Sequence, residues 1–170
     1  DINRATIDDL NNSEAIVIWS EDLKENLPVL YLRVRQAVKN GAKLIVFGHS
    51  NSTLKDIADF YYSEDIVSEN FEIIKDISKL KGIKEHVKDK NVTAIIGKST
   101  PYQLDENLDK LVSYLVENSN SKIMNAFSSG NTFGAINNLD NVKNLRDFTK
   151  NVSSENTDLL FVVGSDPVGR

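Results

Sequence analysis

The chain has 170 residues, of which 40% are hydrophobic and 26% charged, a composition typical of one globular domain or two small lobes. Its net charge is −5 and no basic stripe is present, which argues against nucleic acid and anionic lipid as partners. The chain has no cysteine, so it can hold no disulfide and no cysteine-bound metal or iron–sulfur cluster. No run of about 18 apolar residues occurs, and we predict no direct membrane span.

The first part of the chain predicts a β-α-β unit after a helical turn capped by Thr6. Residues 15–19 are all apolar, which predicts a strand buried on both faces, as in a parallel sheet. Pro28 begins a stretch of apolar residues at helical spacing, and Asn40-Gly41 is typical of a left-handed C-terminal cap. A second buried strand is predicted over 44–47, completing the unit.

Strands and helices continue to alternate along the chain. The patterns predict, in order, a short helix over 54–59, a strand at 60–62, helical segments at 71–80 and 83–87, strands at 92–96 and 122–124 with a helix over 105–117 between them, a helix over 141–150 and a strand over 158–163. We therefore predict an α/β fold with a Rossmann-like, doubly wound and mainly parallel sheet. The charged stretch 81–90 is the expected boundary between a first lobe, 1–80, and a second, 81–170.

Two predicted strands end in similar polar turns. The strand at 15–19 runs into Ser-Glu-Asp-Leu at 20–23, and the last strand runs into Gly-Ser-Asp-Pro at 164–167. Open α/β sheets bind ligands at the carboxyl ends of their strands. We expect Asp22 to cap the helix that follows it and Asp166 to act as a turn residue, with ligand binding as the alternative for both.

The residues around the first turn argue against a phosphate ligand there. The chain has neither the Gly-rich dinucleotide fingerprint nor a P-loop, and the carboxylates of Glu21, Asp22 and Glu25 would repel a phosphate. His49 follows a strand without an acidic or cysteine partner at a recognisable spacing, and no cluster has metal-ligand spacing. No nucleophile elbow occurs. We therefore predict no catalytic residue and no metal site.

Three segments together resemble the molybdopterin oxidoreductase fold, which formate dehydrogenases, nitrate reductases and the large iron–sulfur subunit of NADH:quinone oxidoreductase (complex I) share. The segments are 28–46, Asn-Thr-Phe-Gly-Ala at 131–135 and the turn at 164–167. The family usually carries Gly-x-Asn-Pro after the first strand and Asp-x-Arg-x-Thr after the second, and these two loops help to hold a pyranopterin-guanine dinucleotide. The order and approximate spacing of the segments agree with the family's.

The chain departs from the family pattern in both of these loops. Ser-Glu-Asp-Leu stands in the first, and His-Ser-Asn-Ser-Thr at 49–53 keeps only Thr53 and lacks the arginine, which removes a charge-assisted contact to phosphate or base. The resemblance therefore implies a vestigial cofactor cleft. Its residues would be Ser20, Glu21, Asp22, His49, Thr53, Asn131, Gly134, Gly164 and Asp166.

The large iron–sulfur subunit of complex I keeps this fold although its pterin site has decayed, and degraded motifs are expected there. The resemblance implies a cofactor-free, non-catalytic scaffold domain, a fragment of a longer parent whose iron–sulfur clusters belong to N-terminal domains outside this sequence. Its partners would be the parent's other domains and neighbouring complex I subunits. The domain itself would be cytoplasmic, on the inner face of the membrane, as a peripheral part of the complex. Two alternatives stay open: a section of an active molybdopterin-dependent oxidoreductase such as formate dehydrogenase, and a stand-alone nucleotide-binding α/β module.

Overall fold

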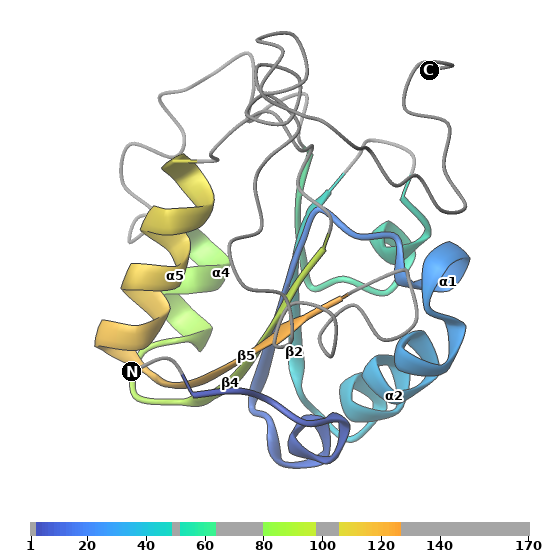
Figure 1. Cartoon of the computed structure of the whole chain (residues 1–170), viewed down its shortest axis with the longest axis horizontal. Helices are drawn as coiled ribbons and strands as arrows, with labels where there is room; N and C mark the ends of the chain where they lie inside the picture. The colour runs from blue at the N-terminus through green and yellow to red at the C-terminus, as the bar shows by residue number, and fades with distance from the viewer. Residues whose placement is uncertain (1–2, 49–51, 64–79, 98–105, 127–170) are drawn as a thin grey trace, which may run out of the picture. The chain divides into compact units, whose positions relative to one another are not determined.

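The described part of the protein is built on a parallel sheet. The computed structural model describes residues 3–48, 52–63, 80–97 and 106–126. Within these ranges the strands are β1 (Ala15–Trp19), β2 (Lys43–Gly48), β3 (Phe60–Ser63), β4 (Asn91–Ile96) and β5 (Asn120–Asn125). Their spatial order is β3-β2-β1-β4-β5, and each neighbouring pair is parallel (Figure 1). The predicted α/β class and parallel sheet are confirmed.

Helices connect and cover these strands. The described ones are the 3₁₀ helices η1 (Ile7–Asn12) and η2 (Thr53–Asp56), and the α-helices α1 (Leu23–Asn26), α2 (Pro28–Lys39), α4 (Lys81–His86) and α5 (Glu106–Asn118). Pro28 lies at the start of α2, and Gly41 follows its end with a φ of +108°, as the sequence predicted. The expected helix over 141–150, the strand over 158–163 and the helix over 71–80, apart from its last residue, lie outside the described residues.

The connection between β2 and β3 differs from the prediction, because a helix over 54–59 is replaced by the shorter η2. Asp59 makes the difference, since its backbone and side chain both bind β2. Its N–H donates to the Leu44 carbonyl at 2.9 Å, and its carboxylate accepts the Leu44 N–H at 3.0 Å and the Lys43 Nζ at 2.7 Å. These contacts hold Asp59 in an extended segment that leads into β3.

The sheet is covered on both faces, which explains the apolar run in β1. On one face, Ala15, Val17 and Trp19 pack in a cluster with residues of α4 and α5. On the other, Ile16 and Ile18 pack in a cluster with residues of η1, α1 and α2. The two groups of helices lie on opposite sides of the sheet in Figure 1. Every residue of β1 is therefore buried.

The strand order reverses at β1. From β1 the chain passes to β2 and β3 on one side of the sheet, and β4 and β5 lie on the other, so the topological switch point falls between β1 and β4. Because β1 pairs with β4, described strands of both expected lobes belong to one sheet. The chain forms two compact units, residues 1–128 and 129–170. The division into lobes at residues 80 and 81 stays a prediction.

Candidate functional site

The switch point is formed by the chain segments that leave β1 and β4. The Gly97 N–H donates to the Trp19 carbonyl at 2.7 Å, and the Ser20 N–H donates to the Phe47 carbonyl at 2.8 Å. The ends of β1, β2 and β4 are thereby tied together. Ser20 has a φ of +52°, in the left-handed region, and this conformation turns the chain away from β1.

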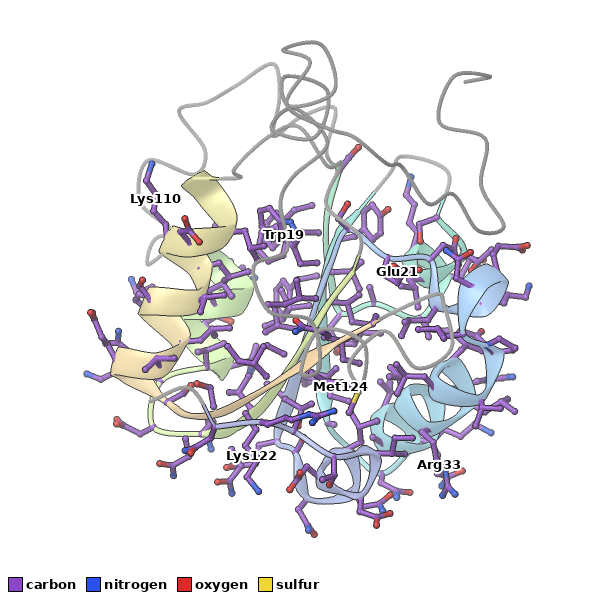
Figure 2. The ribbon with its side chains drawn as sticks, viewed as in Figure 1. Trp19, Glu21, Arg33, Lys110, Lys122 and Met124 are labelled. Carbon is purple, nitrogen blue, oxygen red and sulfur yellow. The ribbon has the colours of Figure 1, made fainter. Side chains whose placement is uncertain are left out.

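Glu21 is buried at this position although it is a charged residue. Only 7% of it is exposed, and its Oε1 accepts a hydrogen bond from the Asn26 amide at 2.7 Å. Figure 2 shows Glu21 on the side of the sheet where α1 lies, whereas Trp19 lies on the side of α5. Burying a carboxyl group is unfavourable unless it is hydrogen-bonded, and Glu residues are seldom buried. The burial of Glu21 therefore distinguishes this loop from an ordinary solvated turn.

Glu21 also lies against Gly97. A Cβ atom placed on Gly97 would collide with the Glu21 Cβ, and it would lie 2.7 Å from the Glu21 Oε2 and 2.5 Å from the Ser20 carbonyl oxygen. Contacts this short do not occur at real Cβ atoms. The side chain of Glu21 and the backbone of Ser20 therefore fill the space beside β4 that any residue larger than glycine at position 97 would need.

Asp22 joins the loop after β1 to the loop after β2. It caps α1, as predicted, by accepting the Lys24 N–H at 3.2 Å. Its carboxylate also accepts the Thr53 N–H at 3.1 Å and the Thr53 hydroxyl at 2.9 Å. Burial would by itself raise the pKa of the Asp22 carboxyl, but the bonds from Thr53 and from the Lys24 and Glu25 N–H groups outweigh burial, so the pKa lies below its usual value.

These bonds use the groups that a phosphate would need. In phosphate-binding loops, backbone N–H groups at the start of a helix donate hydrogen bonds to the ligand and stabilise its negative charge. Here the N–H groups at the starts of α1 and η2 donate to the carboxylate of Asp22. The loop supplies its own anion, and the carboxylates of Glu21 and Glu25 add further negative charge nearby.

The structure brings together four of the nine predicted cleft residues. Ser20, Glu21, Asp22 and Thr53 meet at the switch point. The other five, His49, Asn131, Gly134, Gly164 and Asp166, lie outside the described residues.

Sequence reasoning missed two members of the site, Asn26 and Gly97. The signal for Gly97 was its place directly after a buried strand, where a neighbouring strand end comes close.

A cavity of about 370 Å³ lies beside this site. Its walls are Ile7, the residues from Asn26 to Leu30 where α1 passes into α2, and Met124 to Ala126 at the end of β5. The residues that line it are apolar apart from two asparagines, so the cavity offers no cation for a phosphate.

The described residues contain neither a metal site nor a helix able to span a membrane. Among the residues that the structure describes, no group of three His, Cys, Asp or Glu side chains could hold a metal ion. The helices in the same ranges are too short or too polar to cross a membrane.

The comparison with protein families identifies the domain. The family model for molybdopterin oxidoreductase matches residues 1–99. The chain belongs to the molybdopterin oxidoreductase family. The matched segment contains β1 to β4 and all four described cleft residues of this molybdopterin oxidoreductase domain, and it ends before the motifs at 131–135 and 164–167. The comparison with curated proteins gives no match.

The described residues do not fit the pterin dinucleotide that the family name implies. A glycine in the first loop would let the backbone approach a phosphate, but here the buried Glu21 side chain stands between that backbone and β4. The N–H groups of Lys24 and Thr53 already bond to Asp22. A bound dinucleotide would have to displace Glu21 from its contact with Asn26 and compete with Asp22 for these donors.

Proposed function

We propose that this chain is a cofactor-free domain of a protein similar to the large iron–sulfur subunit of complex I, and that it acts as a scaffold in respiratory electron transfer. The parent would carry its iron–sulfur clusters in other domains and would lie on the cytoplasmic face of the membrane. The observation that carries the proposal is the filling of the switch point by the chain's own carboxylates, Glu21 and Asp22. We infer that the domain itself catalyses no reaction.

Electrostatics supports this proposal. Each carboxylate at about 4 Å from a phosphate charge costs about 1 kcal/mol even in water, and about 4 kcal/mol near a protein surface. The segment that follows β1 carries three carboxylates, with Glu21 and Asp22 before α1 and Glu25 within it. The arginine that the family usually places in the next loop, and that could offset this repulsion, is absent from 49–53. A phosphate-bearing cofactor would gain little here.

A scaffold also needs surface for its neighbours, and one apolar surface is present. Ile7, Val29 and Leu32 are 46%, 67% and 59% exposed. Ile7 and Val29 also line the cavity beside the site. Large exposed apolar side chains that gather in one place are typical of contacts with other proteins or domains, so this surface is where we expect a neighbouring domain or subunit to bind.

The direct test is the cofactor content of the intact parent, purified from its native source. We expect neither molybdenum by elemental analysis nor pterin fluorescence after oxidation in stoichiometric amount. One equivalent of pterin for each parent chain would refute the proposal. The scaffold role requires in addition that the parent co-purifies with NADH:quinone oxidoreductase subunits.

A matched pair of variants tests the apolar surface formed by Ile7, Val29 and Leu32 as the place where a neighbour binds. Val29→Asp places a charge in the exposed apolar surface of α2, whereas Val116→Asp places one at an exposed apolar position of α5, which is 42% exposed. We expect Val29→Asp to reduce assembly of the parent into the complex, measured by native gel electrophoresis, and Val116→Asp to leave it intact. Equal assembly of both variants would contradict the assignment of this surface.

One specific observation favours an active molybdopterin enzyme as the second candidate. The family match covers the site, and Thr53, the residue kept from the family's second loop, is present in it. Stoichiometric molybdenum and pterin in the parent would favour this candidate.

A stand-alone nucleotide module would instead show thermal stabilisation by NADH or a guanine nucleotide. That effect amounts to about 2.7 kcal/mol at 100 times the dissociation constant.

A further inference from the structure

We infer that the side chain of Glu21 closes the switch point by filling the space in which a phosphate-bearing ligand would lie. The loop after β1 also lacks the glycine of the family pattern, but Glu21 adds a second obstacle to such a ligand. The inference deepens the proposed function, on which it rests for the assumption that the site holds no cofactor. It concerns one contact, between Glu21 on the loop after β1 and Gly97 at the end of β4.

The first support is the burial of a group that water would otherwise hold. Glu21 is 7% exposed, and Glu25, four residues further on in α1, is exposed. Both are glutamates of one short segment, so their difference comes from position and not from residue type. Asn26 on α1 donates its amide to the Glu21 Oε1 at 2.7 Å and helps to hold the side chain in this position. A buried carboxylate with a dedicated donor is a built feature and not a chance conformation.

The second support is the fit between Glu21 and Gly97. A Cβ on Gly97 would meet two atoms of Glu21, its Cβ and its Oε2, and one atom of Ser20, its carbonyl oxygen. Glycine at 97 therefore leaves the room that Glu21 occupies, and the two positions depend on each other. In open α/β sheets this room, outside the ends of the two central strands, is where ligands bind.

The third support is that Glu21 closes the switch point independently of Asp22, the residue that caps α1. Asp22, next in the chain, turns toward Thr53 and joins the loops after β1 and β2. Glu21 acts between β1 and β4. The two carboxylates therefore occupy the two sides of the β1 end, and a variant at 21 can be made without removing the Asp22 cap.

The chain has no cysteine, so a single introduced thiol reports the accessibility of one position. In the full 170-residue chain, we expect the thiol of Glu21→Cys to react with an aromatic disulfide reagent at least ~10-fold more slowly than the thiol of Glu25→Cys, because only the former is buried. Equal rates in two folded variants would overturn the inference, because position 21 would then face water.

A double-mutant cycle tests the contact even if the cysteine variant unfolds. Gly97→Ala should lower the melting temperature, and the lowering should be smaller when Glu21→Gly is present, because one of the two colliding residues has then lost its side chain. The collision with the Ser20 carbonyl remains, so we expect partial and not complete rescue. The same lowering in both backgrounds would overturn the inference.

Exclusion of a ligand is tested with inorganic pyrophosphate as the probe. Glu21→Ala and Glu25→Ala each remove one negative charge, but only the first empties the space beside Gly97. We expect pyrophosphate to raise the melting temperature of Glu21→Ala more than that of Glu25→Ala or of the unchanged chain. Equal responses of the three proteins, including no response, would overturn the assignment of exclusion to Glu21.

These outcomes are separate from those that test the proposed function. The pterin content of the parent can refute the scaffold role while position 21 is still found buried. Conversely, an accessible thiol at 21 would leave a cofactor-free parent possible.

Discussion

Removing the Asp22 carboxylate should weaken the connection between the two central loops. Asp22→Ala deletes the cap of α1 and the acceptor of both Thr53 bonds. Loss of a cap costs about 1 kcal/mol. A hydrogen bond to a charged group contributes about 1.5 kcal/mol at the low end of its range. The low end applies here because the two Thr53 donors are only partly buried, so water can replace the carboxylate as their hydrogen-bond acceptor.

Because contributions that share one carboxylate do not simply add, we expect a total loss of about 2–3 kcal/mol in the free energy of unfolding. For a chain of this length that loss lowers the melting temperature by roughly 5–10 °C. The assay is urea denaturation at neutral pH followed by circular dichroism. Asp56→Asn, at an exposed acidic position in η2, is the matched control and should change stability by less than about 0.5 kcal/mol.

The partner variant makes the reasoning refutable. Thr53→Val removes the hydroxyl but keeps the N–H, so a cycle of Asp22→Ala and Thr53→Val isolates the bond of 2.9 Å between the two side chains. We expect a coupling of about 1 kcal/mol. If the two single effects add without coupling, or if Asp22→Ala matches the control, the bond between the loops does not stabilise the fold as argued.

Three other substitutions test separate parts of the fold. The side-chain hydrogen bond from Lys122, followed by those from Thr6, lowers the pKa of Asp9 to about 2. This stabilisation is therefore present above about pH 4 and lost as the pH falls toward 2, so Asp9→Asn should show a weaker acid dependence in denaturant titrations between these values. Gly41→Ala should cost about 1 kcal/mol by the same titration at neutral pH, because φ is +108° there although the surrounding space is open. Phe47→Ala should cost about 3–5 kcal/mol and alter the fluorescence of Trp19, whose ring centroid lies 5.0 Å from that of Phe47.

The strands could be predicted where burial on both faces leaves a plain mark in the sequence. β1 and the middle of β2 are uninterrupted apolar runs, because each residue packs in one of the two clusters. The pattern is weaker in β3, whose four residues are all half-buried, and in β5, where buried and exposed residues alternate. The length of η2 could not be predicted, because the bonds of Asp59 to β2 decide it.

At the site, local chemistry was readable and long-range contact was not. The cap made by Asp22 needs only the next two residues, and it was predicted. Its bond to Thr53 spans 31 positions and depends on the pairing of β1 with β2. A glutamate between a serine and an aspartate looks solvated in sequence. Its burial depends on Gly97, which the pairing of β1 with β4 brings close.

The segment before η1 has a consequence for association between molecules. Beyond β5, the Ala5 N–H donates to the Ile123 carbonyl and the Ile123 N–H donates to the Asn3 carbonyl, both at 2.8 Å, and Arg4 forms a parallel bridge with Ile123. Unpaired groups at a sheet edge are a template on which a second chain can add a strand, the first step of edge-to-edge aggregation. The three residues from Asn3 to Ala5 use these groups in the middle of β5. A sheet extended from this side would first have to displace them.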